Sequence, residues 1–146
     1  MKSRMLVGLG LAFVAVAAVV AAEGVKLEGV KCVVAASKPA KEGNAVDYKG
    51  GKVYFCCMNC PKAFSADTAK FAAKANAQLV ATGQAKQAKC PLTGGPLNPA
   101  TKISVAGADV CFCCEKCQGK AKDAKDQVEF IFNDKAFEKA GYTVGK

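Results

Sequence analysis

The sequence predicts an α+β protein of two small tandem units, each made of a cysteine in a loop, a β-hairpin and a following helix. Nine cysteines form two sets, and each set ends in Cys-Cys-x-x-Cys. Before each of these motifs, two short runs of β-prone residues flank a glycine, which is a hairpin signal. After each motif the chain is expected to continue into a helix. The repetition of these features is the basis of the prediction.

The first 22 residues have the features of a secretory signal peptide in the expected order. Lys2 and Arg4 precede an apolar run over residues 5–20, and small residues end the segment at Ala22. This order is typical of exported proteins. The run of about 16 apolar residues is shorter than the roughly 20 that a membrane-spanning helix needs. We therefore expect cleavage near Ala22, export to the periplasm or out of the cell, and no membrane attachment afterwards.

The rest of the chain, residues 23–146, is basic but lacks arginine. It keeps 19 of the 21 basic residues against 12 acidic ones, a net charge of +7, and the one arginine, Arg4, lies in the expected signal peptide. Arginine supplies the bidentate contacts to phosphate and guanine that nucleic-acid binding uses. We therefore do not expect a nucleic-acid partner, and the scattered lysines indicate a solvated surface.

The two cysteine sets belong to an internal repeat of 57 residues. The first set is Cys32, Cys56, Cys57 and Cys60, and the second is Cys90, Cys111, Cys113, Cys114 and Cys117. Outside the cysteines, Pro39, Val46, Gly50, Val53 and Phe55 match Pro96, Ile103, Gly107, Val110 and Phe112. Cys90 matches Cys32 after one gap, and Cys111 stands where the first copy has a tyrosine. We expect one unit over residues 23–83 and the other over 84–146, each too small to be stable without a metal or disulfides.

Glycine positions and β-prone runs place the hairpins. The predicted strands cover residues 45–48, 52–56, 102–105 and 108–113. Gly50 and Gly107 lie in the connections, where a tight hairpin turn requires positive φ.

Capping and spacing signals place the remaining elements. Asp67 is expected to cap a helix that follows it. The stretch 78–89 has no clear period. Near the C-terminus we predict a strand over 128–132 and a helix over 134–140 that Gly141 ends.

Residues 48–60, Tyr-Lys-Gly-Gly-Lys-Val-Tyr-Phe-Cys-Cys-Met-Asn-Cys, followed by Phe64 and Phe71, resemble the YHS domain. They are also similar to the related TRASH domains, which have one upstream cysteine and then Cys-x-x-x-Cys and are associated with heavy metals. The positions that match this layout are Cys32, Cys56 and Cys60, and Cys90, Cys113 and Cys117. The resemblance covers residues 31–74 and, less fully, 89–119. It implies a treble-clef-like fold for each unit and metal binding of the kind found beside copper pumps, metal sensors and metallochaperones.

The candidate metal ligands are Cys32, Cys56, Cys57, Cys60, Cys90, Cys113, Cys114 and Cys117. Thiolates suit Cu(I), Zn(II) and iron–sulfur clusters, and the chain has no histidine. Three sulfurs fit Cu(I) or Hg(II), whereas structural zinc normally takes four ligands. We expect copper(I) or zinc(II). Within the vicinal pairs, the resemblance favours Cys56 and Cys113, and zinc-knuckle spacing favours Cys57 and Cys114. The unused member is expected to pack as a small apolar residue.

These observations predict an exported protein, not an enzyme, that holds a soft metal ion in each repeat for buffering, trafficking or resistance, with a metal-delivery protein as an unidentified partner. Two alternatives stay open. Small exported cysteine-rich domains are often stapled by disulfides, and Cys57-x-x-Cys60 has the spacing of a thiol–disulfide oxidoreductase. A c-type haem is excluded because Pro61 and Gln118 stand where its motif needs histidine.

Overall fold

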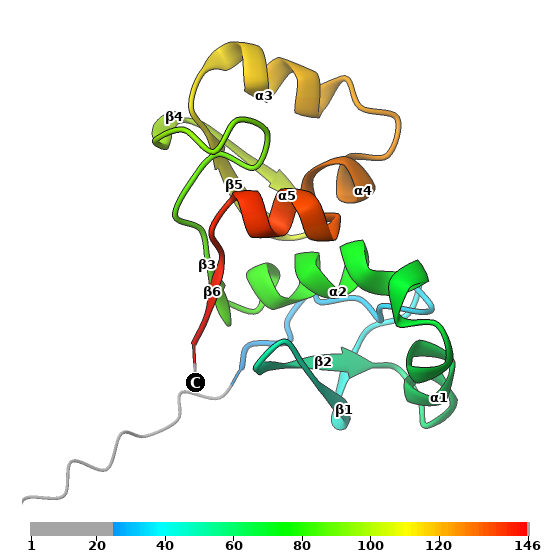
Figure 1. Ribbon diagram of the computed structural model, residues 1–146. Coiled ribbons are helices and arrows are strands. Elements are labelled where there is room, and N and C mark those ends of the chain that lie inside the picture. Colours follow the sequence, from blue (N-terminus) through cyan, green and yellow to red (C-terminus); the bar gives the residue numbers. More distant parts are fainter. Residues whose placement is uncertain (1–24, 146) are drawn as a thin grey trace, which may run out of the picture.

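The computed structural model describes residues 25–145 and has the predicted α+β architecture (Figure 1). The expected signal peptide, residues 1–22, lies outside the described residues. The elements in chain order are β1 (Lys41–Tyr48), β2 (Gly51–Phe55), α1 (Asn59–Ala66), α2 (Thr68–Ala81), β3 (Ala85–Lys86), β4 (Asn98–Val105), β5 (Ala108–Phe112), α3 (Glu115–Lys122), α4 (Gln127–Phe132), α5 (Asp134–Lys139) and β6 (Thr143–Val144). The strands pair as β1–β2, β4–β5 and β3–β6. Among the described residues, no helix is both long enough and apolar enough to cross a bilayer.

The two predicted hairpins form, and they have the same geometry. Their registers match at the 57-residue shift, including a bulge near the start of each first strand. Both turns have positive φ at their two central residues, 50° and 87° at Lys49 and Gly50, and 52° and 81° at Ala106 and Gly107. Two such residues make a type I′ turn, whose twist matches that of the flanking strands. Each first strand begins earlier than predicted.

Helix α2 lies between the two halves of the molecule (Figure 1). Ala75 on this helix packs with the core of the first half, whereas Ala73 and Ala77 pack with the core of the second. Small side chains therefore let both halves approach one helix. The division into units 23–83 and 84–146 remains a prediction, because α2 contributes to both cores.

In the second half, two shorter helices correspond to α2. At the repeat shift, α4 and α5 occupy the place of α2, with a break at Asn133. The strands β3 and β6 pair with each other, Ala85 with Val144 and Lys86 with Thr143. At the 57-residue shift, Lys86 pairs with its own counterpart, Thr143, and Ala85 pairs with Val144, the counterpart of Gln87, as across a two-fold axis. The halves therefore face each other like the subunits of a small dimer.

The predicted strand over residues 128–132 is wrong, because this segment forms helix α4. Asp126 caps the helix, since its carboxylate accepts a hydrogen bond from the Glu129 amide at 3.0 Å. Ile131 and Phe132 are fully buried on the side that packs against α2. A short apolar run does not distinguish a strand from a helix, and here the cap and the packing decide.

The other helix predictions near these positions are confirmed. The Asp67 carboxylate caps α2 by accepting a hydrogen bond from the Lys70 amide at 3.1 Å. Helix α5 lies within the predicted range 134–140, and Gly141 follows with a φ of 60°. The undecided stretch 78–89 contains the end of α2 and the short strand β3.

Three glutamine side chains occupy the open edges of the hairpins. Each accepts a hydrogen bond from the backbone N–H of one strand residue and donates one to its carbonyl, as a further strand would. Gln84 binds Lys52 in this way, Gln78 binds Tyr54 and Gln87 binds Cys111, at distances of 2.6 to 2.9 Å. The second strand of each hairpin has one edge with which no strand of the described chain pairs. The glutamine amides form hydrogen bonds with backbone groups on that edge.

Replacing Gly51 by alanine should destabilise the protein. An added Cβ would lie 2.8 Å from Leu79 Cδ2 and 2.9 Å from Val144 Cγ1, which forces the buried Leu79 and the half-buried Val144 to shift. Ala108 occupies the matching place in the second half, so the hairpin itself accepts an alanine there. The strain would therefore come from the residues that pack on Gly51. We expect a loss of about 1–3 kcal/mol in urea unfolding of the reduced protein. The control Gly43→Ala, whose Cβ would meet nothing within 4 Å, should change stability by less than about 0.5 kcal/mol, and equal losses would contradict the steric explanation.

Candidate metal centres

In the first half, the turn from β2 into α1 carries three cysteines. Strand β2 ends at Phe55, which is fully buried. Cys56 and Cys57 follow in the turn, and Cys60 lies in the first turn of α1. The ring of Phe55 packs on Phe64 of α1, with centroids 5.4 Å apart, and holds the strand end against the helix. The sulfurs of Cys56 and Cys60 therefore meet on one side of the bend, 3.6 Å apart.

The upstream loop brings a third sulfur to this turn. A β-bridge at Lys31 closes the loop. Cys32 is buried, and its sulfur accepts a hydrogen bond from the Ala35 amide at 3.4 Å. The sulfurs of the first triad, Cys32, Cys56 and Cys60, all lie within 4.8 Å of one another.

The second half builds the same arrangement. The Cys90 loop turns back through a hydrogen bond from the Cys90 amide to the Gly95 carbonyl at 2.9 Å. Cys113 follows β5, and its sulfur is 3.6 Å from that of Cys117 in α3. The sulfurs of the second triad, Cys90, Cys113 and Cys117, lie within 4.8 Å of one another. The hydroxyl of Thr93 is 3.2 Å from the Cys113 sulfur; only the nearness of Thr93 to Cys90 in the sequence could have indicated this contact.

One glutamine ties together the two segments that carry the first triad. Gln78 Nε2 donates a hydrogen bond to the carbonyl of Lys31, next to Cys32, at 2.8 Å. The same side chain holds the backbone N–H and C=O of Tyr54, two residues before Cys56. Gln78 is itself buried, so these contacts fix the loop relative to the hairpin.

A different glutamine makes the corresponding contacts in the second half. Gln87 Nε2 donates to the carbonyl of Lys89, next to Cys90, at 2.9 Å. The same side chain holds the backbone of Cys111, two residues before Cys113. Cys111 belongs to neither triad. The two glutamines are not matched by the repeat, so the halves reach one geometry from different residues.

Cys57 and Cys114 lie outside the two triads, next to Cys56 and Cys113. Both outer side chains are exposed, so the expectation that the unused member of each pair packs as an apolar residue is wrong. Adjacent side chains at a strand end point to opposite faces, and turning one member inward therefore exposes the other. The Cys57 sulfur is 3.4 Å from that of Cys60, and the Cys114 sulfur is 3.7 Å from that of Cys113.

Burial and backbone amides give the thiols of the first centre unequal acidities. Burial raises the pKa of Cys60 to about 12, and the neighbouring thiols of Cys57 and Cys56 add to this effect. Loss of solvent also raises the pKa of Cys56. Burial acts in the same direction on Cys32, but nearby backbone amides outweigh it, and the Cys32 pKa is lowered. The Asn59 amide, followed by the Cys60 thiol, lowers the pKa of Cys57 to about 7.

The thiols of the second centre differ in acidity in the same way. Burial raises the pKa of Cys117 to about 12, and the thiols of Cys113 and Cys114 add to it. Burial opposes ionisation of Cys90, but the hydroxyl and amide of Thr93 outweigh it and lower its pKa to about 7. The Cys117 amide lowers the pKa of Cys114. In both centres the helix cysteine holds its proton, while the loop cysteine and the outer cysteine ionise more readily.

The two triads have the chemistry that a soft metal ion requires. Two thiolates bound to one ion at about 2.3 Å lie roughly 3.8 Å apart in a tetrahedral site. The separations of 3.6 Å between the strand-end and helix sulfurs are close to this value. Both groups consist of cysteine alone, which favours thiophilic ions over ions that prefer oxygen ligands.

Replacing Gln78 by leucine should destabilise the fold at the first centre. The change leaves the backbone groups of Tyr54 and the carbonyl of Lys31 without these partners in a buried setting. We expect a loss of roughly 2–4 kcal/mol in urea unfolding of the reduced, metal-free protein. The control is Gln84→Leu, the same chemical change at the more exposed edge beside Lys52, where the loss should stay below about 1 kcal/mol. Equal losses would mean that tying the loop to the hairpin adds no stability of its own.

Comparison with known proteins assigns no family to this chain. No family model, no curated protein and no solved structure matches it. The resemblance to the YHS and TRASH domains therefore remains a prediction, and function is inferred from the geometry and chemistry of the two cysteine triads.

Proposed function

We propose that this protein is an exported metal-binding protein that holds one soft metal ion in each cysteine triad. The observation that carries the proposal is the meeting of three sulfurs, from a loop, a strand end and a helix, within 4.8 Å of one another in each half. Segments far apart in the sequence converge in this way twice in one chain. Thiolates are soft donors that bind such ions strongly.

Copper(I) is the ion that we favour, and zinc(II) is the alternative. A set of three thiolates without histidine suits Cu(I), whereas a structural zinc ion normally takes four protein ligands. Zinc would need a fourth donor, and the outer cysteine of each centre could supply a fourth sulfur. Cys57 lies 3.4 Å from Cys60, and Cys114 lies 3.7 Å from Cys113, sulfur to sulfur. The number of sulfurs around the bound ion, measured by X-ray absorption, distinguishes the two cases.

We also propose that each unit has a treble-clef-like arrangement and is related to the YHS and TRASH domains. The order of loop cysteine, hairpin and helix around each triad supports both. The signal-peptide pattern of residues 1–22 supports export. Metal buffering, trafficking or resistance are roles that fit an exported metal carrier.

A specific observation also favours a second candidate, a disulfide module or thiol oxidoreductase. The exposed Cys57 and the buried Cys60 have their sulfurs 3.4 Å apart, so a small movement would allow a disulfide between them. Metal-free protein in an oxidising compartment would then cross-link within each cluster. Disulfide reductase activity that disappears on replacing Cys57 or Cys60 would favour this candidate.

Removing the metal should lower the melting temperature of the reduced protein. The ion would cross-link the loop at Cys32 to the helix at Cys60, so that its binding free energy adds to the free energy of folding. We expect a strong chelator to lower Tm by at least about 5 °C. Two equivalents of Cu(I) per chain should restore it, in calorimetry under anaerobic, reducing conditions.

Single cysteine replacements provide the matched controls for this experiment. Cys111→Ser removes a thiol outside both triads and should leave the stoichiometry at two ions. Cys60→Ser and Cys117→Ser should each reduce it to one. A melting temperature that does not change with chelator or metal but falls with reductant alone would show that the cysteines form stabilising disulfides.

Metal affinity should fall as the pH falls. The pKa is about 12 at Cys60 and Cys117 and raised at Cys56 in the metal-free protein, so these thiols hold protons at neutral pH and release them when the ion binds. For each proton that the ion displaces, the apparent affinity falls about tenfold when the pH falls by one unit. Competition against a chelator should therefore show at least about a hundredfold loss between pH 8 and pH 6. An affinity independent of pH would contradict ligation by these thiolates.

A further inference from the structure

Each centre has one exposed cysteine that its triad does not contain. The Cys57 sulfur is 3.4 Å from that of Cys60, and the Cys114 sulfur is 3.7 Å from that of Cys113. Each outer sulfur thus contacts a triad sulfur on one side and solvent on the other, whereas the loop cysteines are fully buried. An ion that arrives from solvent therefore meets the outer sulfur before it can reach the loop cysteine.

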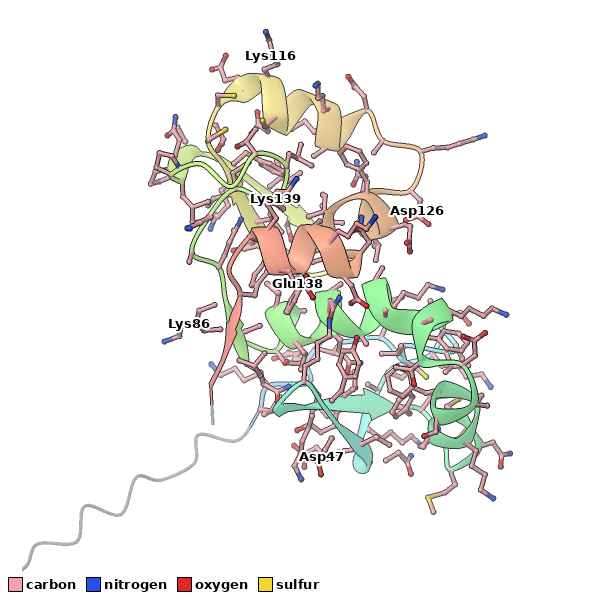
Figure 2. All side chains as sticks on the ribbon, viewed as in Figure 1. Asp47, Lys86, Lys116, Asp126, Glu138 and Lys139 are labelled. Carbon is pink, nitrogen blue, oxygen red and sulfur yellow. The ribbon has the colours of Figure 1, made fainter. Side chains whose placement is uncertain are left out.

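The first centre adds a second exposed soft donor. Met58, directly after Cys57, is 73% exposed although its side chain is apolar, so packing does not explain its place. Its thioether is a donor that suits Cu(I). The repeat puts Glu115 at this position in the second centre, followed by Lys116, which points away from the protein at the start of α3 (Figure 2). The second centre therefore has no thioether beside its exposed cysteine, Cys114.

We propose that Cys57 and Cys114 are exchange ligands, through which each centre receives a soft metal ion from a thiol-bearing carrier and returns it. This inference rests on the proposed function. The outer sulfur and the adjacent triad sulfur accept the ion as a pair, and the buried loop cysteine then replaces the outer sulfur. In the first centre, Met58 holds the ion while a carrier sulfur leaves, so exchange is faster there.

The exchange conserves charge and oxidation state. A Cu(I) bond to the Cys57 sulfur forms as a bond to a carrier sulfur breaks, and the Cys57 proton passes through water to the departing carrier thiolate. Cys60 displaces a second carrier sulfur in the same way. The bond to Cys32 then forms as the bond to Cys57 breaks, and the Cys32 proton passes to Cys57. Cys56 binds last and releases its proton to solvent, and copper remains Cu(I) throughout.

Stopped-flow transfer of Cu(I) from its glutathione complex to the protein tests this proposal, with uptake followed by copper–thiolate absorption. Cys57→Ser should slow the uptake phase that carries half of the total amplitude, by about tenfold or more. The final stoichiometry should stay at two ions and the affinity within about threefold of wild type. Met58→Leu should slow the same half by roughly threefold. Cys114→Ser should slow the other half. Cys111→Ser, which removes a thiol outside both centres, should slow neither.

The possible failures are distinguishable. An affinity that falls in Cys57→Ser in proportion to the rate would make Cys57 a permanent fourth ligand and overturn the exchange role. Uptake by Cys57→Ser and Cys114→Ser at the wild-type rate would show that the outer sulfurs take no part, although the triads bind metal. A wild-type protein that takes up no Cu(I) would overturn the proposed function itself.

Discussion

Both centres depend on a glutamine amide that joins two chain segments far apart in the sequence. The side chain of Gln78 holds the backbone beside Cys32 and, at the same time, the backbone of the strand that leads to Cys56. An amide has donors and an acceptor in fixed directions, so it sets the register of the two segments as well as their separation. Packing of a small apolar core alone would position the sulfurs less accurately than a metal site needs. Gln87 supplies the same constraint in the second half.

The two halves keep their centres alike and differ where they contact each other. Phe64 anchors α1 in the first half, whereas the repeat puts Ala121 at this place and α4 supplies aromatic bulk to the same core. At the first turn, Lys49 reaches across to Asp134 in the second half at 2.6 Å. Its counterpart Ala106 has no side chain long enough to do so, and it borders a cavity of about 370 Å³ between the Cys32 loop and α2. A duplicated unit can thus become an asymmetric pair without a change to the sulfur positions.

The hairpins and the cysteine sets could be predicted from sequence because they follow local rules. Positive φ at Gly50 and Gly107 determines the turns, and the Cys-Cys-x-x-Cys spacing places cysteines before and after a strand-to-helix bend. Helix α4 could not be predicted, because a short apolar run has no period that decides between strand and helix. The contact between Gln78 and Lys31 joins residues 47 positions apart and has no local signal. The exposure of Cys57 also depends on tertiary packing, which selects the member of each vicinal pair that turns inward.

The burial that assembles each triad also controls its charge. Three ionised thiols within 4.8 Å would repel one another in a medium of low dielectric constant. The protein avoids this repulsion by keeping the helix cysteines Cys60 and Cys117 protonated, with pKa values of about 12. The negative charge that does form is directed to the loop cysteines Cys32 and Cys90, where backbone amides and the Thr93 hydroxyl stabilise it. A metal-free triad can therefore stay assembled without three like charges, and a metal ion replaces the protons that burial has kept on the helix cysteines.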